Sequence, residues 1–458
     1  MSVDAIYPLF GRVVLVSGFF RFIAFLGKCL RQSLISQTVR RWWQLGVFSV
    51  KLFSLYWEQS FAKSLANIIS EMIDSLKSGL NAFELSRWKV VLEPLIVILV
   101  VLMPALNSWG LLLPVLILGE LSNPRKTGHN ELVSLWLVMA VSAVFSGGLR
   151  PGIKDLTVYA VWIGMAILVA KGFSPNFSAR IIWALVWSSP LWMGIGFLQQ
   201  WAGVPTPPGW LSSEQSLSIA IRSYSLFQNP NIFALFLLCI LALAVDLADN
   251  YRGRAKFSLF FIIALDIISL YFTYSRGAWL IGGLFLSVWL GRKLGKRAWL
   301  VIPALFLMVL MLNPVRVRML SLLTFSDPSF WYRLRIWEGA IRALPHYLIW
   351  GGGPGSFGRI YPWYQMGNTI GAHAHQLFLQ LWLENGLFTL VFFSYIIVKT
   401  VRDFRCYPNP GKAVVLILAI FFGYGFLETW TQSRLLGGYF WFFLGMAFSF
   451  RPLAKYRF

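Results

Sequence analysis

Long apolar segments, separated by short polar clusters, run through the chain from Val90 to its C-terminal region. Apolar segments repeated in this way are typical of helices that cross a membrane. We therefore predict an all-α, polytopic integral membrane protein with about twelve transmembrane helices. The predicted spans lie at 90–106, 109–121, 131–147, 156–170, 181–198, 231–248, 257–273, 277–290, 298–313, 377–398, 413–427 and 438–450.

Composition agrees with this pattern and excludes a soluble protein. Hydrophobic residues make up 57% of the chain, charged residues only 13%, and the mean hydropathy is +0.66. A soluble domain carries about twice that share of charge. The sequence also has no Gly-Lys-Ser/Thr phosphate loop, no dinucleotide fingerprint and no metal-ligand spacing. We therefore expect no metal, no cofactor and no nucleic-acid partner.

The first 88 residues differ from the rest, so we divide the chain into an N-terminal region, 1–88, and a transmembrane domain, 89–458. Segments 42–57 and 61–76 place apolar residues at helical spacing with charged residues between them. Such helices lie along a membrane surface, here on the cytoplasmic side. The alternative is that the first one or two of them cross. The apolar segment 13–26 contains an arginine and lacks a small-residue cleavage site, unlike a signal peptide.

The net charge of +22 is unevenly distributed over the loops. Lysine and arginine cluster in alternate loops, for example 292–297 and 399–412, whereas the short loops between these carry few. Basic loops are retained on the cytoplasmic side of a membrane. We therefore predict a cytoplasmic (inner) membrane protein with both termini in the cytoplasm and the long loop 314–374 outside.

This outward loop contains arginine but no lysine; its arginines are Arg316, Arg318, Arg333, Arg335, Arg342 and Arg359. A loop of this length inside a compact domain usually has a function. Arginine can hold a phosphate through two parallel hydrogen bonds and always keeps its charge. The loop is therefore expected to bind an anionic group.

Polar residues gather in four clusters on the predicted outer side, at 222–235, 273–280, 332–357 and 372–386. The last cluster places His373 and His375 directly before an apolar span. Each cluster also has an ordinary structural explanation. Asn231 is a plausible helix cap, and Glu384 is a plausible buried acid with satisfied hydrogen bonds.

Taken together and in this order, the clusters resemble the O-antigen ligase and O-antigen polymerase superfamily of bacterial membrane glycosyltransferases, over roughly residues 90–450. The matching pieces are Arg222 with Leu226, Asn229-Pro230-Asn231, Ser275-Arg276-Gly277, Arg333 with Trp337, Pro345, Gly351-x-Gly353-x-Gly355-x-Phe357, and His373-x-His375 followed by Leu377, Glu384 and Gly386. The chain departs from the family at Gln376, where asparagine is common, and at Thr389, where glycine is frequent. No subfamily is therefore assigned.

The resemblance implies transfer of a glycan from a polyprenyl (undecaprenyl) pyrophosphate carrier to a hydroxyl of a glycolipid, glycan or protein at the outer membrane face, as in lipopolysaccharide and other cell-envelope polysaccharide synthesis. His375 is expected to be the base, with His373 orienting or replacing it. The remaining expected site residues bind the pyrophosphate (Arg222, Arg276, Arg333, Arg335 and Arg359) or support the site (Glu384, Asn229 and Asn231). Because pyrophosphate is already a good leaving group, charge stabilisation without a metal suffices.

Three alternatives remain open at this point. A polymerase that joins repeat units shares the same domain, and one sequence does not separate it from a ligase. A branch similar to this family is labelled as inorganic-carbon (bicarbonate) transporters. A transporter places charges near the bilayer midplane, whereas this chain concentrates arginine near the outer face. A structural protein predicts no convergence of the arginines with the histidines.

Overall fold

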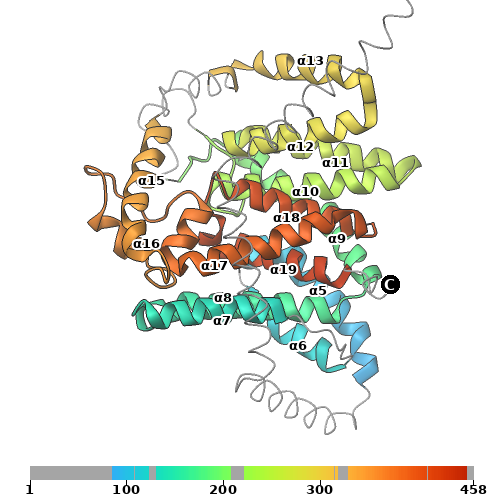
Figure 1. Cartoon of the computed structure of the whole chain (residues 1–458). Coiled ribbons are helices and arrows are strands. Elements are labelled where there is room, and N and C mark those ends of the chain that lie inside the picture. The colour runs from blue at the N-terminus through green and yellow to red at the C-terminus, as the bar shows by residue number, and fades with distance from the viewer. Residues whose placement is uncertain are drawn as a thin grey trace, which may run out of the picture. The chain divides into compact units, whose positions relative to one another are not determined.

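The computed structural model describes residues 85–107, 109–122, 130–207, 221–313, 315–317, 328–409 and 411–450. Every regular element among these residues is a helix (Figure 1). The expectation of an interfacial N-terminal region falls on residues that lie almost entirely outside the described part. The all-α class is confirmed for the described residues.

The helices that matter here follow the predicted spans closely. They are α5 (Leu85–Leu106), α6 (Leu112–Ser122), α7 (Asn130–Phe145), α8 (Leu149–Gly172), α9 (Pro175–Trp201), α10 (Pro230–Asn250), α11 (Gly253–Phe272), α12 (Arg276–Leu294), α13 (Ala298–Leu310), α15 (Pro328–Tyr347), α16 (Phe357–Ile360), α17 (Leu377–Arg402), α18 (Gly411–Tyr424) and α19 (Arg434–Phe450). Every predicted span overlaps one of them.

Within the described residues, 5 helices are long and apolar enough to cross a membrane: α8, α9, α10, α11 and the helix that begins at Leu377. Shorter apolar helices, including α18 and α19, accompany them. These helices indicate a protein embedded in a membrane. The number of crossings, the orientation and the outward position of the long loop stay predictions.

Helices α10 and α19 form the core of the bundle. In α10 almost every side chain from Pro230 to Ala248 is buried, and α19 is buried along nearly its whole length. Figure 1 shows α10, α18 and α19 between α7 and α8 on one side and α11 to α13 on the other. The approach of α19 to α8 depends on small residues: a Cβ at Gly437 would overlap the ring of Trp162, and one at Gly445 would lie 2.9 Å from the Cα of Ala166. Small residues allow the two helices to pack this closely. Inside a bilayer the hydrophobic effect does not drive helices together, so such close packing stabilises their association instead.

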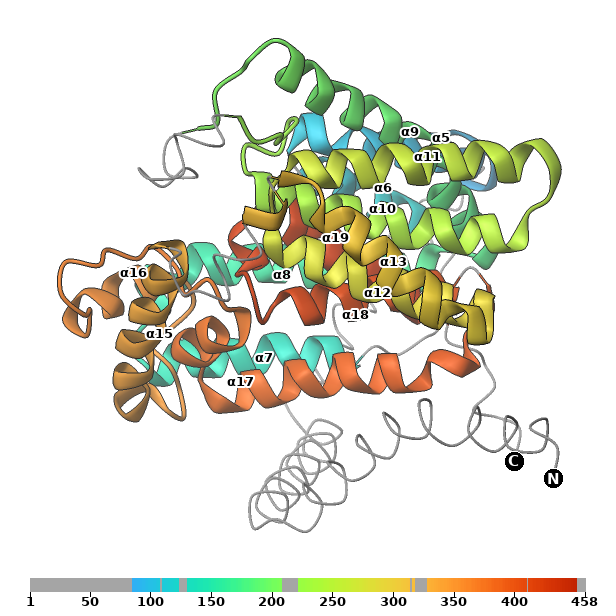
Figure 2. The same ribbon diagram turned by 90° about the horizontal axis from the view of Figure 1, so that it is seen from above.

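A smaller layer, made of α15, α16 and the segment 351–374, lies at one end of α7, α8 and α17 (Figures 1 and 2). The long loop expected from the sequence is therefore largely folded in its described part. Its own apolar cluster includes Ile336, Phe357 and Tyr361 and is joined to α17 through the buried side chain of Leu383. This attachment fixes α15 against the end of the bundle and so positions the arginines that α15 carries.

The glycine-rich stretch 351–357 is a packing element rather than a phosphate cradle. Gly351, Gly353 and Gly355 have φ angles of 66°, 92° and 67°, which favour glycine. A Cβ at Gly353 would lie 2.8 Å from the Cα of Gly148 at the start of α8. The amide of Phe357 donates to the Glu384 carboxylate over 3.2 Å, and the Gln380 amide donates to the same oxygen over 2.7 Å. The loop therefore binds an internal carboxylate.

Candidate active site

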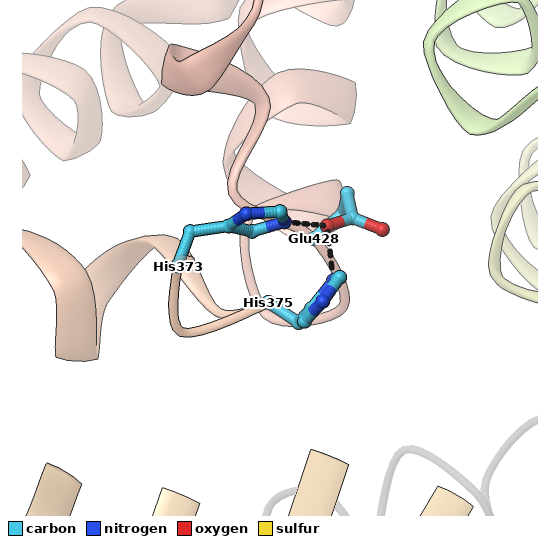
Figure 3. Close-up of side chains that lie close together, drawn as sticks. All are labelled: His373, His375 and Glu428. Carbon is cyan, nitrogen blue, oxygen red and sulfur yellow. Dashed lines mark hydrogen bonds and ion pairs between the residues drawn. The ribbon is translucent and has the colours of Figure 1, made fainter. Parts of the chain in front are cut away.

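The side chain of Glu428 is the centre of a polar network at one end of the bundle. Glu428 lies between α18 and the short 3-10 helix Trp430–Gln432, and its side chain is only 5% exposed. Its Oε1 atom accepts a hydrogen bond from Nδ1 of His375 over 2.9 Å, and Nε2 of His373 lies 3.7 Å away (Figure 3). The backbone amide of Thr429 also donates to Oε1.

The second carboxylate oxygen of Glu428 binds two further groups. Arg333 of α15 donates to Oε2 over 3.1 Å, and the Asn231 side-chain amide of α10 donates over the same distance. A second nitrogen of Arg333 donates to the carbonyl of Leu427 over 2.6 Å. One buried carboxylate therefore joins α10, α15 and the segment that precedes α17, although these lie far apart in the sequence.

Arg222 enters the same network from the segment before α10. Its guanidinium is buried, with Nε donating to the carbonyl of Thr273 over 2.9 Å and one terminal nitrogen donating to Oδ1 of Asn231 over 3.1 Å. Asn229 caps α10 by accepting from the Asn231 amide over 2.8 Å. Asn231 therefore stands between Arg222 and Glu428 and fixes the separation of the two charges.

Arg276 begins α12 and contacts α15. Its guanidinium donates to the Ser329 hydroxyl of α15 over 2.7 Å. The preceding residue, Ser275, lies 3.2 Å from the Tyr424 hydroxyl, which in turn donates to the Asn231 carbonyl over 3.2 Å. These bonds place the first turn of α12 beside the start of α10, so Arg222, Arg276 and Arg333 converge from three separate elements.

Three of the residues expected in the site lie elsewhere. Arg335 is exposed and follows Arg333 by two positions on α15, which turns it about 200° around the helix. Arg359 of α16 is also exposed. Neither belongs to the network around Glu428 that the described residues form, and the Glu384 carboxylate is occupied by the glycine-rich stretch. The structure thus brings together Arg222, Arg276, Arg333, Asn229, Asn231, His373 and His375.

The network sets the charge states of Glu428 and His375. Burial alone would raise the pKa of Glu428, but the Arg333 guanidinium and His375 hold this pKa well below its usual value. Burial lowers the pKa of His375 below its ordinary 6.5, against the opposing charge of Glu428, and the nearby His373 and Arg333 lower it further. At neutral pH the pair is therefore an ionised carboxylate beside a neutral imidazole.

This pairing decides which nitrogen of His375 can accept a proton. A carboxylate oxygen only accepts hydrogen bonds, so Nδ1 of His375 must carry the hydrogen that it shares with Glu428. The other ring nitrogen, Nε2, is then the basic one. The φ angle of His375 is 50°, an uncommon value outside glycine, so the surrounding bonds hold this residue in a strained backbone conformation. Its ring lies 5.9 Å from that of the half-exposed Tyr332.

His373, His375 and Glu428 also form the one group among the described residues whose ligand atoms could hold a metal ion, all within 4.8 Å of one another. Two observations favour a proton-transfer pair instead. Both Glu428 oxygens already accept hydrogen bonds, and the Arg333 guanidinium beside them repels a cation. The metal-free site expected from the sequence stays a prediction.

Glu428 is the functional candidate that sequence reasoning missed. It is the only acidic residue between 413 and 450, and it follows directly on a predicted span. An isolated acid at the mouth of an apolar helix is a candidate on the same grounds as Glu384. Its 53-residue separation from His375 hides the pairing in the sequence.

Comparison with known families finds a match to part of the chain that forms this network. Residues 259–394 match the family described as O-antigen ligase, which confirms the expected resemblance for that segment. The matched segment runs from α11 into α17 and includes Arg276, Arg333 and both site histidines. Arg222 and Glu428 lie outside it and are joined to it by the hydrogen bonds described above. No curated protein matches the chain.

Proposed function

Since this membrane-embedded chain carries an O-antigen ligase domain, we propose that it transfers a glycan from a polyprenyl pyrophosphate to a hydroxyl acceptor. The proposed location is the outer face of the cytoplasmic membrane. One observation supports the proposal most. Three arginines converge with His375, and Nδ1 of His375 is paired with the buried carboxylate of Glu428. A pyrophosphate ester needs cations for its leaving group, and a sugar hydroxyl needs a base.

The three arginines bind the pyrophosphate of the donor in this proposal. Arg222, Arg276 and Arg333 bring three guanidinium groups into one site, and Arg333 is ion-paired with Glu428. A pyrophosphate brought between them meets fixed donors in a partly desolvated environment, where such interactions are strongest. As the glycosyl bond breaks, negative charge grows on the departing phosphate oxygen, and the arginines stabilise this charge most in the transition state.

His375 activates the acceptor hydroxyl in this proposal. Nε2 of His375 takes the proton of the acceptor hydroxyl while the acceptor oxygen forms a bond to the anomeric carbon of the glycan. The bond from that carbon to the phosphate oxygen breaks, and its electron pair leaves with the polyprenyl pyrophosphate. His375 becomes an imidazolium whose charge Glu428 stabilises through Nδ1. The proton then returns to solvent, and neither metal nor redox chemistry is required.

The polymerase alternative uses the same donor and the same site, and differs only in the acceptor. The transporter alternative is less well supported, because the arginines converge near helix ends and not in the middle of the long apolar helices. The buried Asp266 of α11 does lie inside such a helix, but no hydrogen bond within the described residues reaches its carboxylate. It therefore does not join the network of the site.

Removal of divalent metal should leave the reaction intact. We expect purified protein in lipid nanodiscs to transfer glycan from an undecaprenyl pyrophosphate donor at the same rate with and without EDTA, because arginines supply the positive charge. Product is measured by mass spectrometry of the acceptor. Arg222→Ala should abolish transfer, whereas the matched Arg254→Ala, at an exposed position of α11, should not. Loss of activity in EDTA that returns with added metal would contradict a metal-free mechanism.

Transfer activity should persist to a lower pH than it would if the base were a histidine with the ordinary pKa of 6.5. The base acts only when neutral, so activity is complete above the pKa of His375 and falls about tenfold per pH unit below it. Because burial lowers this pKa from its usual 6.5, the acidic limb of kcat/KM against pH should lie below 6.5. The measurement is a pH profile of transfer from about pH 4.5 to 8.5. A midpoint above 6.5 would show that another group limits the rate.

A further inference from the structure

Helix α12 has a stripe of exposed apolar residues that begins at a site arginine. Arg276 is its first residue, and Leu280, Leu284 and Val288 follow at intervals of four, so the stripe winds gradually around the helix, by about 40° per step. These three side chains are 52%, 67% and 49% exposed. The stripe extends about 18 Å along the helix axis, at about 1.5 Å per residue.

The opposite face of α12 is the one that packs on the bundle. A Cβ added at Gly282 would lie 3.0 Å from Leu238 of α10 and 3.2 Å from Leu270 of α11. Gly283, by contrast, is exposed, and a Cβ there would meet no atom within 4 Å. Gly283 thus leaves a notch beside the stripe, about 60° around the helix axis from Leu280 and on the same side as Arg276.

The neighbouring helix α13 extends this apolar surface. It packs on α12, with which it forms a hairpin at the edge of the bundle in Figure 1. Its side chains are apolar on all sides, and Leu300, Phe306 and Leu307 are 79%, 61% and 63% exposed. At the far end of α12, Arg292 and Lys293 close the apolar stretch with positive charge. Cations at both ends and an apolar face between them suit a helix exposed to lipid.

We propose that the polyprenyl chain of the donor lies along the Leu280–Gly283–Leu284–Val288 stripe of α12 while its pyrophosphate is bound at Arg276. This inference rests on the proposed function and adds the path of the lipid. A lipid anchored by its phosphates must leave the site along some helix. Arg276, the residue proposed to bind the pyrophosphate, is the first residue of α12. The stripe on α12 is therefore the apolar surface that continues directly from the pyrophosphate site.

Physical chemistry limits what the stripe contributes. Lipid tails are as apolar as leucine, so a protein groove inside a bilayer gains little hydrophobic affinity for a polyprenyl chain. The stripe therefore acts by orientation: it guides the chain so that the pyrophosphate arrives at the arginines in the right position. Misplacement of a reacting group by about 1 Å can cost about a hundredfold in rate.

The chain offers a matched control on another helix. In α9, Gly194 lies between the exposed Leu191 and Leu198, and a Cβ added there would also meet no atom within 4 Å. This stripe shares with α12 an open glycine three residues after an exposed leucine, and it has no site arginine at its head. Gly194→Phe and Gly283→Phe therefore place the same side chain on similar lipid-facing surfaces, and only the second blocks the proposed path.

The test compares two donors that carry the same glycan, one on an undecaprenyl chain and one on a short prenyl chain of two units. For Gly283→Phe, we expect kcat/KM to fall at least about tenfold with the long donor and to stay unchanged with the short one. Gly194→Phe should leave both values unchanged. Equal losses with both donors, or no loss with the long donor, would overturn the proposal.

A binding experiment separates this proposal from the proposed function. Undecaprenyl pyrophosphate that carries a diazirine in its chain, without any glycan, is photolysed with the protein in nanodiscs. Labelling of peptides from α12, suppressed by unlabelled undecaprenyl pyrophosphate but not by phosphatidylglycerol, is the expected result. Labelling spread equally over α9 and α12 would overturn the path even if glycan transfer is observed. Specific labelling of α12 without transfer by wild-type protein would retain the lipid path and reject the enzymatic function.

Discussion

Replacement of Glu428 by glutamine is expected to lower the rate of glycan transfer by up to about ten-thousandfold, the loss seen when the buried carboxylate that orients a catalytic histidine is replaced by its amide. Glutamine has nearly the same shape but no charge, and its NH₂ group cannot accept a hydrogen bond. His375 would then lose the partner that holds its hydrogen on Nδ1, and Arg333 would lose its counter-ion. The loss should appear in kcat, because the carboxylate stabilises the imidazolium that forms during transfer.

This prediction needs a control for folding, because removing one partner of a buried ion pair can itself destabilise a protein by about 3–5 kcal/mol. Glu428→Asp keeps the charge and should retain much more activity than Glu428→Gln. Glu338→Gln is the matched control: Glu338 also pairs with an arginine of α15, but on the exposed surface. Thermal unfolding is measured for all three variants. Full activity of a folded Glu428→Gln protein would show that the carboxylate does not position the base.

How far the sequence predicts the fold depends on which forces shape each part. The spans at 231–248 and 257–273 agree with α10 and α11 to within a few residues, because a continuous apolar segment must form a helix in a membrane. The glycine-rich stretch is different. Its sequence alone indicates a flexible turn, with a phosphate-binding loop as the less favoured interpretation. Only the packing of Gly353 on Gly148 and the bond from Phe357 to Glu384 show that it holds the layers together.

The site residues also divide into those that the sequence predicts and those that only contacts in the folded protein identify. Arg222, Arg333 and His375 could be selected from residue chemistry and family resemblance, since arginine suits phosphate and histidine suits proton transfer. Arg335 was selected for the same chemistry but lies on another face of α15, because neighbouring arginines on a helix point in different directions. Glu428 was missed because its role arises entirely from a contact between distant segments. A carboxylate shared by α10, α15 and the segment before α17 has no local signature.

The two histidines of the site differ in ways that make them separable by experiment. His375 lies 2.9 Å from Glu428, whereas His373 lies 3.7 Å away, beyond a good hydrogen bond. Their rings are 4.0 Å apart between centroids, so His373 also restricts the position of His375. We therefore propose the basic role for His375 and a supporting role for His373.

His375→Ala should accordingly lower kcat for transfer by at least about a hundredfold, the lower end of the contribution that a general base makes, with little change in KM. His373→Ala should cost about tenfold or less, because Glu428 still orients the remaining imidazole. The pH profile provides the sharper test. The acidic limb should disappear in His375→Ala, whose residual activity no longer depends on an imidazole, and should persist in His373→Ala. If instead His373→Ala lost the limb and most of the activity, His373 would be the base, and Glu428 would serve mainly to hold Arg333 beside the pyrophosphate.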